Sequence, residues 1–256
     1  MFEAALYFRF IEWKKITAWK CALEEIKRLQ SIDLAQKSLE DKSSKVSKIN
    51  VISLNTVSLI SHIDDIRFDQ KFKSADLILL QETSLQSDHS HEEQLAIEGK
   101  QSHFNSIGHR KGLAIYFTDN FLQRSAITKQ THQISSVSSS NLCVVNVYRS
   151  KQAGYQFNHD LETFISEPGL DYILLGDWNF CCRDETNHSV LLLLQKHSFS
   201  MGFDPPIATH NQGRCLDQIY YRFSNNSTTK LIACQISPCY FSDHDAISIS
   251  IAVNST

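Results

Sequence analysis

The stretch YILLGDWNF, residues 172–180, decides how the rest of this chain is interpreted. Its first four residues are aromatic or aliphatic, as is typical of a strand that is buried on both faces. The chain then runs through Gly176 into Asp177, Trp178 and Asn179. Because side chains alternate along a strand, we expect the acid and the amide to face one side, about 6–7 Å apart, and the tryptophan to face the core. Taken alone, Asp-x-Asn after a glycine is also typical of a plain turn. The surrounding sequence has to decide between a turn and a pair of site residues.

Short apolar or alternating runs divide the chain from residue 49 onward. Most have the length of ordinary strands, and a few segments with helical spacing lie between them. We expect strands over residues 49–55, 75–82, 112–117, 142–148, 172–177, 214–222, 230–236 and 244–253, and helices over 57–72, 158–165 and 188–199. This pattern predicts an α/β fold, a four-layer sandwich in which two mixed β-sheets pack face to face with helices outside. The His- and Ser-rich segment 83–110 is expected to be a surface loop.

Residues 1–47 differ in character from the rest of the chain. They contain neither glycine nor proline, and apolar side chains recur at three- to five-residue steps, as on one face of a helix. A polar stretch follows at 40–48. We therefore expect two parts, a helical N-terminal appendage over 1–47 and a larger domain over 48–256. The appendage suits a partner-binding helix, the remnant of a neighbouring domain or an artefact of gene modelling.

The composition argues against several classes of protein. The chain has 256 residues, 42% of them hydrophobic and 21% charged, which suits a globular protein with a sizeable core. No apolar run approaches the ~18 residues that a membrane span needs, so we expect no membrane association. The seven cysteines, an odd number without a CxxC pair, argue against a disulfide framework and a zinc knuckle. We therefore expect an intracellular protein, nuclear or cytoplasmic, with a monomer as the default state.

Polar side chains gather where the predicted strands end or begin. Strand ends lie on one edge of a sheet sandwich, so groups from different strands can converge there. Carboxylates and amides can hold a hard cation such as Mg²⁺, and a histidine can draw charge from a phosphorane. The pattern therefore favours metal-assisted phosphoester hydrolysis, in which an acid activates water for in-line attack. The residues concerned are Asn55, Glu82, Tyr148, Arg149, Asp177, Asn179, Asp217, Asp243 and His244.

Short motifs follow one another across residues 49–253. They are SLN at 53–55, LLQET at 79–83, GLAIYF at 112–117, VVNVY at 144–148, LLGDWN at 174–179, THNQGRCLDQIY at 209–220 and SDHDAI at 242–247. In this order they resemble the motifs of the endonuclease/exonuclease/phosphatase superfamily, which includes the AP endonucleases, retrotransposon endonucleases, deoxyribonuclease I, sphingomyelinases and inositol-polyphosphate 5-phosphatases. Each motif alone is weak, and it is their order that makes the resemblance specific. Residues 1–47 have no counterpart in it.

The resemblance implies a divalent cation, Mg²⁺ with Mn²⁺ as an alternative, held near Asn55 and Glu82. Glu82 would be the direct ligand, and Asp243 would bind the metal or a water. AP endonucleases often carry an acid two residues after the asparagine of the first strand, where this chain has Val57. One secondary metal contact is therefore missing, as it is in many members of the retroelement type.

The resemblance also implies a role for each of the remaining residues. Asp177 would orient or deprotonate the attacking water, and Asn179 would help to hold water or phosphate. His244 would contact the scissile phosphate, while Asp217 would accept a hydrogen bond from it and fix its tautomer. Tyr148 would hydrogen-bond a phosphate oxygen.

The loop after Tyr148 departs from the family pattern. The common Tyr-x-Pro-Asn is here Tyr148-Arg149-Ser150-Lys151, so contacts with a leaving group or a nucleic-acid strand differ at this point. Arg149 is a candidate for substrate binding, and a solvated surface arginine explains it equally well.

Three functions fit these observations. The first is a nuclease of AP or retroelement type whose partner is a nucleic acid, DNA in particular; the tyrosine at 148 favours it, because the deoxyribonuclease I and sphingomyelinase relatives tend to have histidine there. The second is a phosphatase or phosphodiesterase for a small-molecule or lipid phosphoester. It is favoured by the acidic balance of residues 49–256, fifteen Lys and Arg against twenty-one Asp and Glu, because DNA binding depends on Lys and Arg contacts. The third is a non-catalytic binding module, against which the completeness of the polar set argues.

Overall fold

The computed structural model of the chain describes residues 46–85, 93–106, 108, 111–186 and 188–254. The chain divides into two compact units, and the larger one, Ser47–Val253, contains the structure discussed below. The predicted helical appendage over 1–47 lies outside the described residues, except that its last two residues begin strand β1 (Val46–Asn55). No helix among the described residues is long and apolar enough to cross a bilayer.

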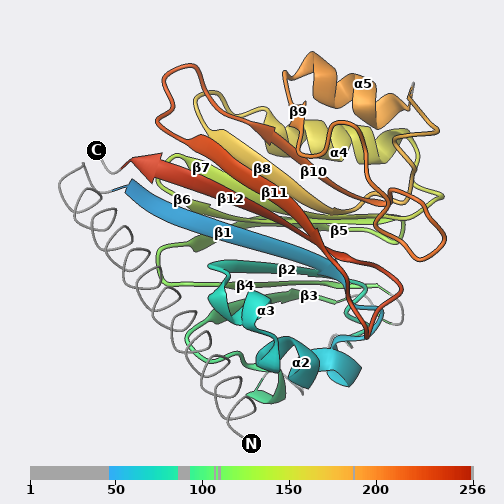
Figure 1. The fold of residues 1–256 in the computed structure, drawn as a ribbon. Helices are drawn as coiled ribbons and strands as arrows, with labels where there is room; N and C mark the ends of the chain where they lie inside the picture. Colours follow the sequence, from blue (N-terminus) through green and yellow to red (C-terminus); the bar gives the residue numbers. More distant parts are fainter. Residues whose placement is uncertain (1–45, 86–92, 107, 109–110, 187, 255–256) are drawn as a thin grey trace, which may run out of the picture. The chain divides into compact units, whose positions relative to one another are not determined.

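The larger unit is built on two six-stranded sheets (Figure 1). Each sheet contains a parallel pair, β1 with β2 and β7 with β8, among antiparallel neighbours, so both sheets are mixed as predicted. The first sheet has the order β11-β12-β1-β2-β4-β3, with β2 (Leu77–Gln81), β3 (Gln101–Asn105), β4 (Leu113–Phe117), β11 (Lys230–Ser237) and β12 (Ala246–Asn254). The second has the order β5-β6-β7-β8-β10-β9, with β5 (Leu122–Thr128), β6 (His132–Ser139), β7 (Leu142–Arg149), β8 (Asp171–Asp177), β9 (Ser200–Met201) and β10 (Asp217–Arg222).

Three layers of hydrophobic core separate the four layers of secondary structure. One core lies between the sheets, and β8 contributes Ile173 and Leu175 to it. The alternate residues of β8, Tyr172 and Leu174, face the opposite way and pack with the buried residues of two helices. Because β8 is buried on both faces, its sequence is continuously apolar rather than alternating.

The helices lie on the outer faces of the two sheets (Figure 1). Leu59 and Phe72, from α2 and α3, join a core with residues of the first sheet. Phe157 and Leu191, from α4 and α5, join the core on the second sheet. The predicted four-layer sandwich is therefore confirmed. The bounds are α2 (Leu59–Phe68), α3 (Gln70–Ser74), α4 (Tyr155–Ile165) and α5 (Ser189–Lys196).

The strand register brings one end of each sheet to the candidate site. Asn55 is the last residue of β1 and pairs with the last residue of β2. In the second sheet, Tyr148 and Asp217 lie on either side of Asp177, because β7 and β10 both pair with β8 at this position. His244 lies just before β12, a neighbour of β1. The ends of β1, β2, β7 and β8 and the starts of β10 and β12 therefore supply these polar groups.

Gly176 allows the two parallel strands of the second sheet to approach one another beside the site. Its φ is +148°, and a Cβ built on it would lie 1.9 Å from the carbonyl oxygen of Val147 on β7. No side chain fits at that distance. The glycine of the LLGDWN motif is therefore explained by a backbone contact.

Several parts of the fold differ from the sequence-based expectation. The segment 83–110, predicted to be a surface loop, contains the edge strand β3 and a 3₁₀ turn, Glu93–Leu95. The helix predicted over 57–72 is divided into α2 and α3, and strands β5, β6 and β9 were not predicted. The sequence of β6, HQISSVSS, is rich in serine, and that of β5, LQRSAIT, mixes polar and apolar residues.

Candidate active site

The carboxylate of Asp177 is held by two amides. Asn55 Nδ2, from the other sheet, donates to Asp177 Oδ2 at 3.0 Å. The backbone N–H of Asn179 donates to Oδ1 and Asn179 Nδ2 donates to Oδ2, both at 2.9 Å. These three bonds come from both sides of the carboxylate, so they fix its orientation although it lies at the end of a strand.

The chain does not stay extended after Asp177. Asn179 has a φ of +52°, so the backbone folds back and the two side chains are in contact. The prediction that they lie 6–7 Å apart along a strand is wrong for this reason. Trp178, between them, is fully buried as predicted, and its indole N–H donates to the carbonyl of Gln218.

Glu82 leaves β2 with a φ of +50° and meets Asn55 and Tyr148. Burial raises the pKa of Glu82, and hydrogen bonds from the Asn55 and Tyr148 side chains oppose that shift without cancelling it. Burial, followed by the charges of Glu82 and Asp177, keeps the pKa of Tyr148 well above its ordinary value. The Tyr148 hydroxyl therefore stays protonated and serves as a donor.

Asn55 lies beside Asp177 and Glu82, although its amide oxygen faces away from them. Asn55 Oδ1 accepts the backbone N–H of Val57 at 3.1 Å. The amide nitrogen therefore faces the carboxylates of Asp177 and Glu82. In this arrangement Asn55 is a donor that holds two acids in place, and Glu82 is the residue with carboxylate oxygens for a cation.

Asp217 and His244 form a buried pair. His244 Nδ1 donates to Asp217 Oδ2 at 2.7 Å, and both side chains are almost completely buried. Burial lowers the pKa of His244, but the charge and hydrogen bond of Asp217 outweigh it, and the pKa rises to about 9. His244 is therefore cationic at neutral pH.

The loop before β10 holds Asp217 in place. The hydroxyl of Thr209, which is fully buried, accepts the backbone N–H groups of Leu216 and Asp217 at 3.2 and 3.0 Å. The carbonyl of Thr209 accepts the N–H of Asp245 at 2.7 Å, which ties this loop to the chain around His244.

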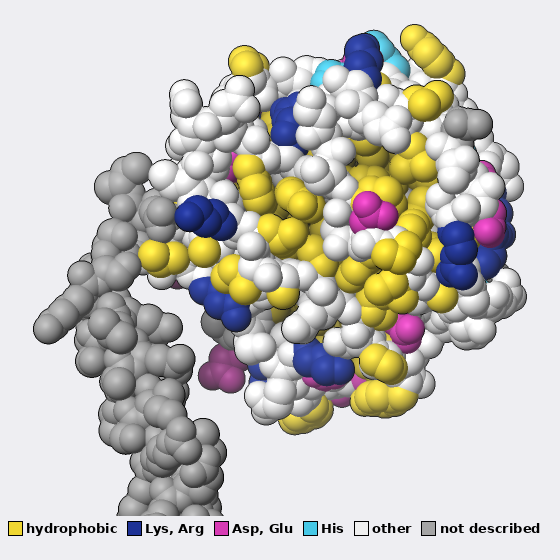
Figure 2. All heavy atoms as spheres, turned by 45° about the horizontal axis from the view of Figure 1, so that its top comes forward, with side chains coloured by type: hydrophobic (Ala, Val, Ile, Leu, Met, Phe, Trp, Pro, Cys, Tyr) yellow, Lys and Arg dark blue, Asp and Glu magenta, His cyan; other side chains and the backbone are white. Residues whose placement is uncertain are grey.

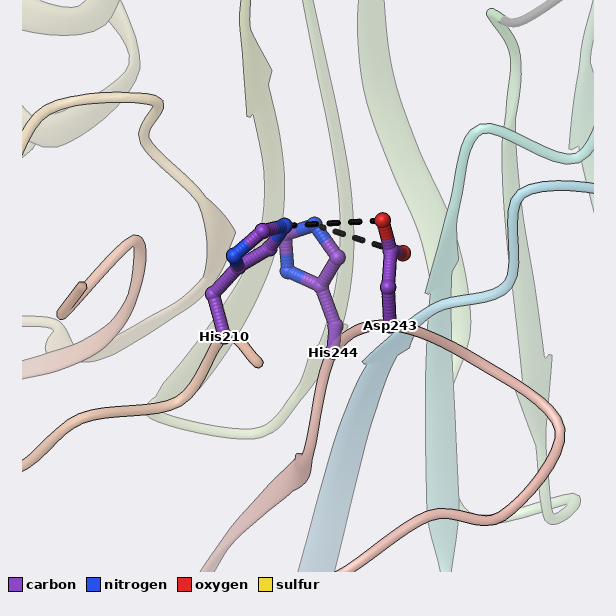
Figure 3. Close-up of side chains that lie close together, drawn as sticks. All are labelled: His210, Asp243 and His244. Atoms are coloured by element: carbon purple, nitrogen blue, oxygen red, sulfur yellow. Dashed lines mark ion pairs between the residues drawn. The ribbon is translucent and has the colours of Figure 1, made fainter. Parts of the chain in front are cut away.

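Sequence reasoning missed His210, the residue after Thr209. It forms an isolated β-bridge with His244, and their rings meet edge to face with centroids 4.7 Å apart. Asp243 lies beside both rings, with Oδ2 3.5 Å from His210 Nε2 and Oδ1 4.0 Å from His244 Nε2 (Figure 3). His210 does lie within the THNQGRCLDQIY motif, so the sequence placed it near Asp217. Its spacing from the other site residues, however, did not mark it as a residue of the site.

Arg149 lies near enough to Asp177 for the two charges to interact, but its side chain is buried. Its guanidinium is buried, and it donates to the carbonyls of Trp178 and Ala153 at 3.2 and 3.0 Å. It also lies over the rings of Phe157 and Phe180. These contacts connect the strand end to the core, so Arg149 is not a solvated surface arginine, and its role in substrate binding stays a prediction.

The charges at this site are unbalanced. Glu82, Asp177, Asp217 and Asp243 place four carboxylates around the cationic imidazole of His244. Burial, together with the charges of Asp217 and Glu82, raises the pKa of Asp177. A divalent cation would relieve this repulsion, and oxygen donors suit a hard ion such as Mg²⁺. The residues present therefore fit a metal.

Solved structures of nucleases and phosphatases share this fold. AP endonuclease LMAP from Leishmania major has a TM-score of 0.65 and 15% identity, over 80% of this chain and 87% of that chain. The 3′ phosphatase NExo from Neisseria, bound to product DNA hairpin, has a TM-score of 0.61 and 17% identity, over 78% and 98%. The human Nocturnin catalytic domain has a TM-score of 0.56 and 15% identity, over 81% and 97%.

The search of curated proteins gave no match. The family model described as the Endonuclease/Exonuclease/phosphatase family matches residues 53–244, which extend from β1 to His244 and contain every polar residue of the site described above. The chain belongs to the Endonuclease/Exonuclease/phosphatase family, a family of phosphoesterase and nuclease enzymes.

Proposed function

We propose that this protein is a Mg²⁺-dependent phosphodiesterase that cleaves DNA as an endonuclease of AP or retroelement type. The observation that carries the proposal is the arrangement of Asp177 and His244. A carboxylate held by three hydrogen bonds and a cationic imidazole held by Asp217 meet at adjoining strand ends. Such a pair suits a reaction in which one group orients a nucleophile and the other meets developing charge.

In this proposal Asp177 orients the attacking water and accepts its proton. Burial and the neighbouring carboxylates raise its pKa, and the cation proposed below would oppose that shift and keep the carboxylate ionised to accept the proton. The Nε2–H of His244 donates to an oxygen of the phosphate as negative charge builds there, and Asp217 holds the ring in the required tautomer. The protonated hydroxyl of Tyr148 and the amide of Asn179 hold the substrate or water. Glu82 and Asp243 would hold Mg²⁺, or Mn²⁺ in its place, which would neutralise phosphate charge and stabilise the leaving oxygen.

A DNA substrate is supported by the solved relatives. AP endonucleases of Leishmania major and Xenopus laevis, and a 3′ phosphatase bound to a DNA hairpin, share the fold. The free cysteines Cys143, Cys181, Cys182, Cys215, Cys234 and Cys239 support a reducing compartment, nuclear or cytoplasmic.

A small-molecule or lipid phosphoester is the second candidate substrate. The net charge of the chain is −3. On the face drawn in Figure 2, Lys and Arg side chains are mostly separated from one another, and hydrophobic side chains gather between them. Because phosphate-backbone binding depends on Lys and Arg contacts, the negative net charge favours this candidate.

One assay separates the two candidates. Supercoiled plasmid, an oligonucleotide with a single abasic site and p-nitrophenyl phosphate are each incubated with the protein, with Mg²⁺ and with EDTA. We expect Mg²⁺-dependent nicking or abasic-strand cleavage, at a rate that falls with added salt. Turnover of the small ester alone would favour the second candidate, and no turnover of any substrate would favour the non-catalytic module.

A further inference from the structure

The tautomer of His210 is set by a backbone contact. The N–H of Gln212 lies 3.1 Å from His210 Nδ1. A backbone N–H can only donate, so Nδ1 is the acceptor and the ring proton is on Nε2. His210 therefore directs an N–H donor away from its own loop.

His244 directs the same kind of donor to the same place. Its Nδ1 is engaged by Asp217 at 2.7 Å, which leaves Nε2 as the atom that faces outward. One ligand atom from each of His210, His244 and Asp243 lies within 4.8 Å of the others (Figure 3). The two Nε2 atoms approach Asp243 only to 3.5 and 4.0 Å. Within the described parts of the chain, neither Nε2 has an acceptor at hydrogen-bond distance.

The backbone holds His210 in this position before any ligand binds. Its N–H donates to the carbonyl of Arg214 at 3.1 Å, and the N–H of Asn211 donates to the carbonyl of Asp243 at 2.9 Å. The bridge to His244 completes the frame. Donors that are positioned in advance stabilise developing charge without a cost of reorganisation.

We propose that His210 is a second imidazole donor to the reacting phosphate, which it contacts through Nε2–H beside His244. This inference rests on the proposed function, because it assigns His210 to the same site. The ligand class is a phosphoester with two oxygens free to accept. Asp243 lies beside the two rings without a hydrogen bond to either, and it is exposed, so its carboxylate can turn from the rings toward the proposed cation when a phosphate enters.

A transition metal held by His210, Asp243 and His244 is the competing interpretation of this cluster. Imidazole nitrogens with a carboxylate are a donor set that suits Zn²⁺. Coordination by His210 Nε2 would move its proton to Nδ1, where it would face the Gln212 N–H. The contact with Gln212 would be lost, so the tautomer favours an anion over a cation.

Two variants of His210 separate the donor from the loop contact. Gln carries its amide nitrogen near the position of Nε2, so His210→Gln keeps the donor and loses the acceptor for Gln212. Asn carries its amide oxygen near the position of Nδ1, so His210→Asn keeps that acceptor and loses the donor. We expect His210→Asn to lower kcat/KM for the cleaved phosphoester about ten- to a hundredfold, the usual effect of one hydrogen bond to a charged group. His210→Gln should keep most of the activity.

Long-range proton–nitrogen NMR of the histidine rings tests the same inference without catalysis. In the full chain we expect the Nε2–H tautomer for His210 and a shift of its Nε2 resonance on titration with inorganic phosphate. The shift should be absent in His210→Asn. If the wild type cleaves no phosphoester, the proposed function fails, and the phosphate titration alone decides the role of His210.

Three results would overturn the inference. The first is the Nδ1–H tautomer, or a His210 resonance that phosphate does not move. The second is wild-type kcat/KM in His210→Asn, or a larger loss in His210→Gln, which would indicate a purely structural contact with Gln212. The third is tight Zn²⁺ binding by calorimetry that disappears in His210→Asn, which would assign the cluster to a metal.

Discussion

At the scale of single residues, the site depends on buried acids whose partners lie far away in the sequence. Asn55 and Asp177 are 122 positions apart, and Asp217 and His244 are 27 apart. The sequence predicted that these residues would meet, because their motifs have the order found in the family and each lies at a strand end. It could not predict that Asn55 turns its nitrogen to the acids, because the contact of Asn55 Oδ1 with Val57 depends on a left-handed turn at a valine. It also could not predict that Arg149 is buried.

The pair of Asp217 and His244 makes a prediction about pH. The pKa of His244 is raised to about 9, so its cationic form persists at neutral pH and is lost as the pH rises through that value. Asp217→Asn removes the charge that raises it. We therefore expect the alkaline limb of the pH–rate profile to move to lower pH, together with a lower maximal rate.

A double variant tests whether the two residues act together. Combining Asp217→Asn with His244→Ala should lower the cleavage rate little more than His244→Ala alone, because the effects of residues that act as one unit are not additive. Losses that simply add would contradict the pairing.

The same pair should affect stability. A histidine whose pKa is raised on folding stabilises the protein fully below its unfolded pKa of about 6.5, and that contribution is lost as pH rises through about 9. The free energy of unfolding from urea titrations should therefore decline from pH 6.5 to 9 more steeply in the wild type than in His244→Ala. Parallel declines in the two proteins would show that the pair does not stabilise the fold.

Glu82 makes a prediction about the metal. Glu82→Gln keeps the shape of the side chain and removes its charge, so we expect lower activity that excess Mg²⁺ restores only in part. Glu98→Gln, at an exposed position, is the matched control. The measurement is the cleavage rate as a function of Mg²⁺ concentration. Equal rates for Glu82→Gln and the control at limiting Mg²⁺ would remove Glu82 from the site.

At the scale of secondary structure, predictions were correct where a strand is apolar and wrong where burial involves polar side chains. Strands β2, β7 and β8 each contain a run of at least three apolar residues, because both faces of these strands are covered, and all three were predicted. Strand β6 was not predicted, because Gln133, Ser135 and Ser136 are fully buried and break the apolar pattern. Strand β5 lies at the edge of its sheet and is mostly exposed, so it has little reason to be apolar.

Gly176 makes a prediction at this scale. A methyl group there would lie 1.9 Å from the carbonyl oxygen of Val147, so Gly176→Ala has to push β7 and β8 apart. We expect a loss of about 1–3 kcal/mol in the free energy of unfolding, the usual cost of overpacking, and reduced activity because Asp177 is displaced. Gly154→Ala is the control, because its Cβ would meet nothing within 4 Å. Chemical denaturation measures the free energy of unfolding of both variants. Equal stability of Gly176→Ala and Gly154→Ala would contradict the close approach of the strands.

At the scale of the whole molecule, Ser47–Val253 has a complete set of layers of its own. Three hydrophobic cores lie within it, and its strands and the loops that join them supply every residue of the candidate site. The sequence predicted a boundary near residue 47 from the change in composition. The role of the preceding segment stays a prediction.

A truncated chain that begins at Ser47 tests this boundary. We expect it to be soluble, to unfold cooperatively and to cleave the same substrate at the rate of the full chain, because its cores are complete. Circular dichroism during thermal unfolding and the cleavage assay check both properties. Insolubility, together with strong binding of a hydrophobic dye, would instead show that residues 1–46 cover part of the core.

The measurement that tests the central claim most directly is the Mg²⁺-dependent cleavage rate of Asp177→Asn. The change removes the charge that orients water while Asn55 and Asn179 remain. We expect a fall of about 10²–10⁴-fold, typical of a lost general base, in a protein that folds and binds substrate like the wild type. Asp64→Asn, an exposed change on α2, should cleave normally. Cleavage by Asp177→Asn at more than half the wild-type rate would contradict the assignment of this site.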